Sequence, residues 1–172
     1  MAADVRTFVR DVPDFPKKGI VFKDITPLLA HPEAFATAID RLSEPFLAKG
    51  IGVVAGIESR GFLLATPIAY RLGAGVVPIR KKGKLPRETL SATYDLEYGQ
   101  DSIEAHADSF STGTKVLLVD DVLATGGTAG AACELIEKLG GTLVGAAFLI
   151  ELGFLNGRRK LQGRTIHSLI TY

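Results

Sequence analysis

The sequence contains one cysteine and no tryptophan, and it lacks a long apolar run. A single cysteine cannot form a disulfide within the chain, so nothing indicates an oxidising compartment. The charged residues Asp4 and Arg6 interrupt the N-terminus where a signal peptide would need an apolar segment. The longest apolar run, residues 143–150, is far shorter than the ~18 residues of a membrane span. These absences predict a cytoplasmic protein with no membrane partner.

The chain also lacks an excess of charge of either sign. Its 20 Lys and Arg residues nearly balance its 19 Asp and Glu residues, which leaves a formal net charge of +1. So small a charge creates no long-range field that attracts polyanions, and we therefore expect no nucleic-acid partner. The length of 172 residues and the hydrophobic content of 47% are typical of a single globular domain, here residues 1–172.

Strand-like and helix-like segments alternate through most of the chain. Because the strand-like segments are apolar throughout, they predict an α/β fold whose central, mostly parallel sheet is flanked by helices. Ligands of such sheets bind beyond the carboxyl ends of the strands, here just after Ile57, Ile79 and Val119. The predicted strands are residues 51–57, 75–79, 115–119, 142–150 and 165–170, and the predicted helices are residues 60–72 and 127–139.

Two segments depart from this alternation. Residues 1–32 are interrupted by prolines and glycines and are predicted to form an irregular N-terminal arm, which a helix from Glu33 follows. Residues 81–106 begin as a polar, turn-rich loop and continue as two short strands around Gly99. We expect this second segment to be a mobile loop joined to a hairpin.

The segment from Val116 to Thr128, with the sequence VLLVDDVLATGGT, carries the clearest chemical signal. Glycines let the backbone approach an anion, the start of the following helix offers N–H groups, and the threonines add hydroxyl donors. Two adjacent carboxylates would repel a phosphate, but they can accept hydrogen bonds from a sugar diol. An Asp-rich turn before a capped helix explains less of this pattern than a ribose 5-phosphate site does. The predicted substrate-binding residues are Asp120, Asp121, Ala124, Thr125, Gly126, Gly127 and Thr128.

No lysine follows these glycines, and no G-x-G-x-x-G follows a strand, so neither a Walker A loop nor a dinucleotide site is indicated. The segment instead resembles the phosphoribosyl-pyrophosphate (PRPP) signature of the type I phosphoribosyltransferases. The resemblance implies the fold of that family, a homodimer, and Mg²⁺ carried mainly by PRPP or pyrophosphate oxygens and water. We expect no metal held by the protein, because His31, His106 and His167 show no ligand spacing.

The turn Glu58-Ser59-Arg60-Gly61 directly follows the first predicted strand. Exposed N–H groups beside an arginine predict a second anion site, although Ser59 could instead simply cap a helix. In the type I family this turn resembles the pyrophosphate-binding loop, which often contains a non-proline cis peptide. The resemblance implies substrate binding by Glu58 and Ser59 and a catalytic role for Arg60.

Residues 80–88, RKKGKLPRE, concentrate five cations against one carboxylate. A charge run is usually a solvated loop, and a nucleic-acid patch would need interleaved aromatic residues, which are absent here. The loop resembles the flexible catalytic loop of the family, which implies that Arg80, Lys81 and Lys84 neutralise the leaving pyrophosphate under a lid that excludes water. Arg87 stands where we expect a smaller or more neutral residue.

Residues 20–29 resemble the base-binding hood of the adenine-specific members of this family, and residues 84–86 and 92–99 match the same members. Phe22 offers a face on which a purine can stack, although a core position would explain it equally well. The backbone of Val21 and Lys23 is expected to pair with the edge of the base. On the hairpin, Glu97 is the candidate for handling the purine proton and Tyr98 lies beside the leaving group, unless both are ordinary strand residues.

Together these features predict a purine-salvage transferase. It would move the 5-phosphoribosyl group from PRPP to N9 of adenine and release AMP and pyrophosphate, so its partners would be small molecules. One alternative is transfer to a 6-oxopurine, namely hypoxanthine, guanine or xanthine. Another is a non-catalytic regulator that binds PRPP, but such a protein would need an additional DNA-reading module.

Overall fold

The computed structural model describes residues 4–96 and 98–172. These residues fall into two compact units, with the boundary between Arg41 and Leu42. The first unit corresponds to the predicted arm and most of the helix after it, and the second unit contains the predicted sheet. That the whole chain acts as one domain stays a prediction.

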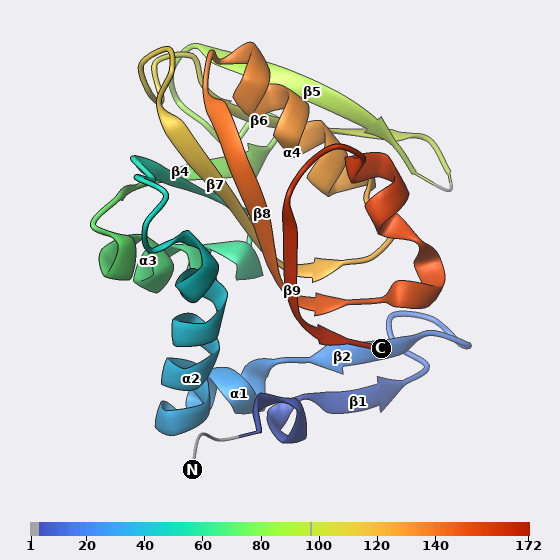
Figure 1. Cartoon of the computed structure of the whole chain (residues 1–172). Helices are drawn as coiled ribbons and strands as arrows, with labels where there is room; N and C mark the ends of the chain where they lie inside the picture. Colours follow the sequence, from blue (N-terminus) through green and yellow to red (C-terminus); the bar gives the residue numbers. More distant parts are fainter. Residues whose placement is uncertain (1–3, 97) are drawn as a thin grey trace. The chain divides into compact units, whose positions relative to one another are not determined.

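The second unit is built on a seven-stranded sheet with the order β5-β6-β4-β3-β7-β8-β9 (Figure 1). The five strands from β4 to β9 in this order run parallel, whereas β6 is antiparallel to both β4 and β5. The predicted central, mostly parallel sheet is therefore confirmed. The strands are β3 (Val53–Ile57), β4 (Gly75–Lys81), β5 (Thr89–Asp95), β6 (Gln100–His106), β7 (Lys115–Leu123), β8 (Thr142–Glu151) and β9 (Ile166–Thr171).

Two long helices cover opposite faces of this sheet. Helix α3 (Arg60–Leu72) joins β3 to β4, and α4 (Gly127–Lys138) joins β7 to β8 on the other side of the sheet centre. Right-handed crossovers that step in opposite directions place their helices on opposite faces. The packing agrees, because Ala55 and Ile57 lie in the core that contains α4, whereas Gly56 lies against Ala65 of α3.

Strand β7 continues beyond its predicted end at Val119 and stops only at Leu123. The reason is the neighbouring strand, since β8 pairs with β7 from Lys115 as far as Leu123, which lies opposite Glu151. Charged residues ended the apolar pattern in the sequence, but they do not end the hydrogen-bonded ladder. Asp120 and Asp121 therefore lie within the strand rather than after it.

The first unit is more regular than predicted. Strands β1 (Arg10–Pro13) and β2 (Val21–Asp24) form an antiparallel pair, so the expectation of an irregular arm was wrong. Pro16 and Gly19 lie between the two strands, where the Asp14 carboxylate accepts a hydrogen bond from the Gly19 amide at 2.7 Å. The other elements of this region are η1 (Val5–Phe8), α1 (Thr26–Ala30) and α2 (Pro32–Ser43), and α2 crosses the boundary between the units.

Short 3-10 helices complete the second unit. Helix α2 ends at Ser43 and gives way to η2 (Glu44–Phe46), where Pro45 lacks the N–H that a continuing α-helix would need. The connection between β8 and β9 contains η3 (Gly153–Leu155) and η4 (Gly157–Leu161), which the sequence analysis did not identify. Their short length leaves too few residues for a helical period to be recognisable.

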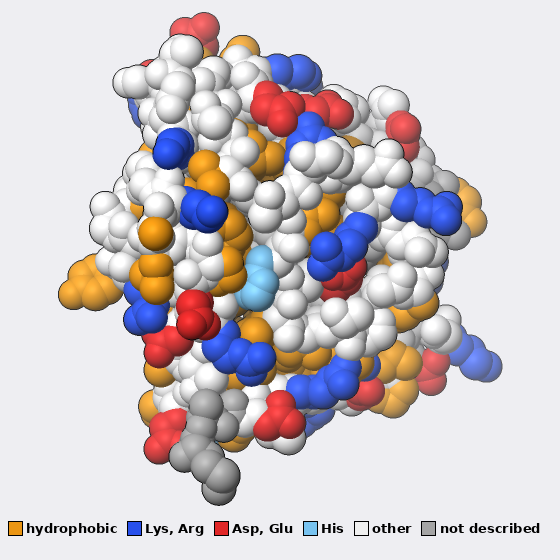
Figure 2. All heavy atoms as spheres, in the orientation of Figure 1, with side chains coloured by type: hydrophobic (Ala, Val, Ile, Leu, Met, Phe, Trp, Pro, Cys, Tyr) orange, Lys and Arg blue, Asp and Glu red, His pale blue; other side chains and the backbone are white. Residues whose placement is uncertain are grey.

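The described surface carries both signs of charge. On the face shown in Figure 2, Lys and Arg side chains are interspersed with acidic and uncharged ones. Among the described helices, none is both long and apolar enough to cross a membrane.

The contact between β3 and α3 has a measurable consequence. A Cβ at Gly56 would lie 2.7 Å from the Cβ of Ala65, so Gly56→Ala forces the helix away from the sheet. We expect the free energy of unfolding to fall by about 1–3 kcal/mol, the usual penalty for overpacking. Urea denaturation followed by circular dichroism measures this change.

Gly75→Ala is the matched control on the adjacent strand, because its Cβ would meet no atom closer than 3.8 Å. Equal urea midpoints for the two variants would contradict the proposed packing of α3.

Candidate active site

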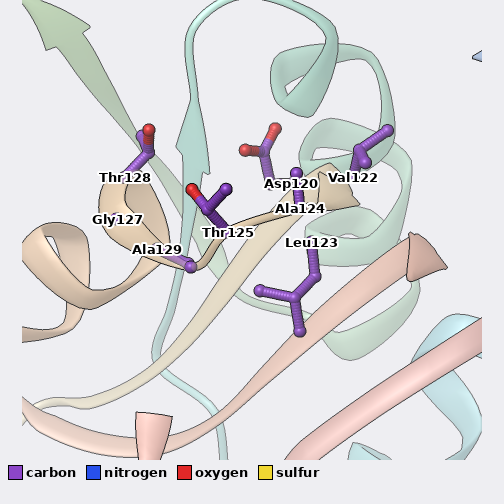
Figure 3. A pocket seen from close by; sticks show the side chains of 9 residues that line it. Asp120, Val122, Leu123, Ala124, Thr125, Gly127, Thr128 and Ala129 are labelled. Atoms are coloured by element: carbon purple, nitrogen blue, oxygen red, sulfur yellow. The ribbon is translucent and has the colours of Figure 1, made fainter. Parts of the chain in front are cut away.

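A pocket of ≈ 80 Å³ opens where β7 passes into α4. We call residues 124–128, which form its floor, the glycine loop. The carboxylate of Asp120 and the hydroxyls of Thr125 and Thr128 point to the same side of this loop, whereas Leu123 points to the opposite side (Figure 3). The pocket thus has hydrogen-bond acceptors at one end and donors at the other. Its lining residues are Asp120, Val122, Leu123, Ala124, Thr125, Gly126, Gly127, Thr128 and Ala129.

Gly126 determines how α4 begins. It occupies the N-cap position with a φ of 80°, in the left-handed region that glycine tolerates and most other residues avoid. Glycine has no side chain that could cap the helix. The first N–H groups of α4 are therefore available to a ligand. The start of α4 is therefore suited to an anion, as the sequence predicted.

The acid pair, Asp120 and Asp121, is held by one arginine. Nε of Arg60, the first residue of α3, donates to Oδ2 of Asp121, whose residue is only 5% exposed. The Asp121 amide donates to Oδ1 of Asp120 at 2.9 Å. Burial, together with the negative charge of Asp121, raises the pKa of Asp120 well above its ordinary value. The pair therefore favours one negative charge over two, and Arg60 balances that charge.

Gly61 lets the start of α3 approach the acid pair. A Cβ at this position would lie 2.9 Å from Oδ1 of Asp120 and 3.0 Å from the carbonyl oxygen of Val119. Arg60 and Gly61 together bring the turn after β3 into contact with the end of β7. The structure thus joins two segments that the sequence analysis treated as separate anion sites.

The turn itself has the geometry that the family resemblance implied. The peptide between Glu58 and Ser59 is cis, which confirms that expectation. Ser59 occupies the N-cap position of α3, yet among the described residues its side chain makes no capping hydrogen bond. The structure therefore confirms the alternative that Ser59 is the N-cap residue of α3, whereas substrate binding by Ser59 stays a prediction.

Glu58 binds the cations of the basic loop. Its carboxylate accepts hydrogen bonds from Nε of Arg80 at 3.3 Å, from the Lys81 amide at 2.9 Å and from Nζ of Lys84. Burial alone would raise the pKa of Glu58, but the bonds from Lys84 and the Lys81 amide and the nearby positive charges bring it below its ordinary value. Glu58 is therefore an ionised partner of the basic loop. That it also binds the substrate stays a prediction.

Lys81 is held by the hairpin of β5 and β6. Its Nζ donates to the Tyr94 hydroxyl at 2.6 Å and to Oδ2 of Asp101, and the Tyr94 hydroxyl donates to the same carboxylate at 3.1 Å. The hydrogen bond from Lys81 is the main reason why the pKa of Asp101 is below its ordinary value. Tyr94 also lies behind the glycine loop, because a Cβ at Gly127 would be 3.4 Å from its ring.

Arg87, where the sequence analysis expected a smaller or more neutral residue, forms an ion pair with Asp108 and lies 3.2 Å from Nδ1 of His106. Like Arg80, Lys81 and Lys84, it has a carboxylate partner. The basic loop is thus tied by ion pairs to its surroundings. Whether the loop moves as a lid stays a prediction.

The predicted base-binding residues lie in the first unit. Val21, Phe22 and Lys23 are consecutive on β2, where the Phe22 ring packs edge-to-face on Phe15 with centroids 5.2 Å apart. Nζ of Lys23 donates to Asp11 on β1 at 2.6 Å. Phe22 is half-buried on a hairpin rather than enclosed in a core. The role of all three residues in binding a base stays a prediction.

Of the two predicted catalytic residues on the hairpin, Glu97 lies outside the described residues. Tyr98 lies at the turn between β5 and β6, and the residue is 84% exposed. A side chain as exposed as this one can reach a substrate. The catalytic role of Tyr98 stays a prediction.

Three residues of the site escaped the sequence analysis. Tyr94 and Asp101 could have been found, because a hairpin centred near Gly99 places them opposite each other, as the observed register does. Gly157 also lies against the glycine loop, with an ideal Cβ position 2.3 Å from the carbonyl oxygen of Ala124. No pattern around Gly157 in the sequence indicates its contact with Ala124.

The residues present fit a metal ion that arrives with a substrate. Across residues 4–96 and 98–172, no three His, Cys, Asp or Glu side chains group as metal ligands. The acid pair offers at most two carboxylates, and Asp121 is already bound by Arg60. Magnesium usually keeps several waters and binds through one or two carboxylates together with substrate phosphates.

The chain matches a known protein family over most of its length. The family model of the phosphoribosyl transferase domain matches residues 25–164. The chain is 58% identical over 175 residues to the adenine phosphoribosyltransferase of Thermobifida fusca, with 99% of each chain covered.

Two solved structures are also similar to this chain. Adenine phosphoribosyltransferase from Thermoanaerobacter pseudethanolicus is 50% identical with a TM-score of 0.96, and 100% of each chain is covered. The enzyme from Saccharomyces cerevisiae, complexed with an imino-altritol bisphosphate and adenine, is 41% identical with a TM-score of 0.92, covering 98% of this chain and 97% of that one.

The raised pKa of Asp120 predicts how stability changes with pH. The unfolded chain releases this proton near pH 4, whereas the folded chain keeps it to higher pH, so raising the pH through this window favours unfolding. Asp120→Asn removes the titration and keeps a group that can donate to Asp121. At pH 7 we expect the variant to have the higher free energy of unfolding, because only the wild type loses stability as the pH rises through this window.

Urea denaturation between pH 4 and pH 7 tests this prediction, since the difference should shrink as the pH falls. Asp108→Asn serves as the control, because its partner Arg87 holds the pKa of Asp108 below the ordinary value and the difference should have the opposite sign. A pH-independent difference for Asp120→Asn would contradict the assignment.

Proposed function

The chain belongs to the phosphoribosyl transferase family, and from this premise we propose that it transfers the 5-phosphoribosyl group of PRPP to N9 of adenine. The products are AMP and pyrophosphate. The observation that carries the proposal is the pocket at the end of β7, which Asp120 and the glycine loop line and which offers groups suited to the two ends of a ribose 5-phosphate. Asp121, the other member of the acid pair, follows Asp120 in β7 and is bound by Arg60. The relatives at 50–58% identity that bear the name adenine phosphoribosyltransferase support the choice of base.

The glycine loop binds the 5′-phosphate. Its N–H groups at the start of α4 and the hydroxyls of Thr125 and Thr128 donate hydrogen bonds to the ester oxygens. The acid pair accepts hydrogen bonds from the ribose hydroxyls. A pair that carries one negative charge balanced by Arg60 repels the phosphate less than two free carboxylates would.

In the chemical step, the bond between C1 and N9 of adenine forms while the bond between C1 and the pyrophosphate oxygen breaks. The electron pair of the broken bond leaves with pyrophosphate, and the purine proton passes to a base. Arg80, Lys81 and Lys84 balance the leaving charge, and Arg60, Glu58 and Ser59 line the turn that receives it. A multiply charged pyrophosphate competes with Glu58 for Arg80 and Lys84, which Glu58 binds in its absence.

The first unit supplies the base site in this proposal. Phe22 stacks on the purine, and the backbone of Val21 and Lys23 pairs with the edge of the base. The yeast relative complexed with adenine supports adenine as the acceptor. On the hairpin, Glu97 takes the purine proton and Tyr98 lies beside the leaving group.

Mg²⁺ would be held mainly by PRPP or pyrophosphate oxygens and water, with Asp120 and Asp121 as the protein carboxylates available to it, and it would screen the charge of the pyrophosphate. We also propose that the enzyme works in the cytoplasm as a homodimer. The balanced charge and single cysteine support the first point, and the family resemblance supports the second.

The choice of base is tested by incubating the protein with PRPP, Mg²⁺ and one of adenine, hypoxanthine, guanine or xanthine. We expect AMP from adenine and little product from the three 6-oxopurines, measured by liquid chromatography. Exclusive use of a 6-oxopurine would overturn the assignment. Absence of a nucleotide product from all four bases would overturn the transferase function itself.

The role of Glu97 is tested by Glu97→Gln, which keeps the size of the side chain and removes its basicity. We expect kcat with adenine to fall by at least about a hundredfold, the usual contribution of a positioned base. Asp95→Asn is the control, because it removes a carboxylate two positions away on the same hairpin. Full turnover by Glu97→Gln would show that the proton goes elsewhere.

A further inference from the structure

The connection between β8 and β9, residues 152–165, contacts the glycine loop although nothing in its sequence predicted a site there. An ideal Cβ at Gly157 would lie 2.3 Å from the carbonyl oxygen of Ala124 and 3.1 Å from the amide nitrogen of Gly126. Reciprocally, a Cβ at Gly126 would lie 2.3 Å from the carbonyl oxygen of Gly157. Two backbones thus meet with no space for a side chain between them.

An ion pair anchors Gly157 at this place. Nε and Nη2 of the adjacent Arg158 donate to the two carboxylate oxygens of Glu151 at 2.6 and 2.8 Å. The Glu151 side chain is only 9% exposed, and Glu151 lies opposite Leu123, the residue before the glycine loop. Two parallel bonds to a largely buried carboxylate fix both position and orientation. The anchor therefore lies next to the segment that it would support.

The remainder of the connection is also fixed to the second unit. The Leu152 amide donates to the Leu123 carbonyl at 2.9 Å, and Leu161 is buried in the core that contains α4. Gly126 and Gly127, in contrast, place few restrictions on the backbone of the glycine loop. Contact with a rigid neighbour would keep the N–H groups of this loop in one orientation.

We propose that Gly157 and Arg158 are positioning residues of the phosphate site. Gly157 provides the backbone surface against which the glycine loop rests, and Arg158 with Glu151 holds that surface in place. The inference rests on the proposed function, since it assigns the glycine loop to the 5′-phosphate. Neither residue touches the substrate in this arrangement, so their effect passes through the loop.

The first test is Gly157→Ala, whose Cβ must displace Ala124 or Gly126. We expect the Kd for ribose 5-phosphate, measured by calorimetry, and the KM for PRPP to rise by about tenfold or more, while the KM for adenine changes by less than about twofold. Gly153→Ala is the matched control on the same connection, because its Cβ would meet the carbonyl oxygen of Tyr172 at 3.3 Å and not the glycine loop.

The second test changes the anchor without burying an unpaired carboxylate. Arg158→Lys keeps the positive charge beside Glu151 but loses the two parallel bonds. We expect a smaller rise in the same two constants than Gly157→Ala gives. Arg164→Lys is the matched control, since Arg164 forms a similar pair with Glu137 near the far end of α4, at 3.0 and 3.1 Å.

The outcomes separate this proposal from the proposed function. If Gly157→Ala or Arg158→Lys lowers Tm while the Kd for ribose 5-phosphate stays at the wild-type value, the residues are structural only and the inference is wrong. It is equally wrong if the two control variants weaken binding as much. If the wild-type protein itself neither binds ribose 5-phosphate nor makes a nucleotide, the proposed function fails first.

Discussion

Two like charges stand side by side at the carboxyl end of β7, and the surrounding structure is organised around balancing them. Arg60 binds Asp121, and the Asp121 amide binds Asp120. Burial and the neighbouring charge raise the pKa of Asp120, so the pair favours a single charge. Under the proposed function, a phosphate bound one loop away meets less negative charge than two ionised carboxylates would present.

Close backbone approach is the second condition of the site, and glycine makes it possible at three points. Gly61 brings α3 against Asp120, Gly126 starts α4 with a positive φ, and Gly157 presses the β8–β9 connection onto the loop. Each contact joins segments that are distant in sequence. The residues that line the pocket all come from the end of β7 and the start of α4, and the connections that carry Gly61 and Gly157 pack against this segment.

Carboxylates hold the cations of the basic loop in place. Glu58 binds Arg80 and Lys84, and Asp101 binds Lys81. Such ion pairs fix the position of the positive charge. Under the proposed function, that charge would already be in position when the leaving group develops its own charge.

Local patterns were enough to predict the parallel sheet and the helices after β3 and β7, because apolar periodicity is a property of neighbouring residues. The acid and glycine spacing of residues 120–128, on which the phosphate-site hypothesis depends, is local as well. The folded chain was needed to show where β7 ends, that Arg60 pairs with Asp121, that the N-terminal segment forms a hairpin, and that Gly157 contacts Ala124. Strand pairing, ion pairs and backbone contacts between distant segments depend on how the chain returns to the same place. No window of neighbouring residues contains that information.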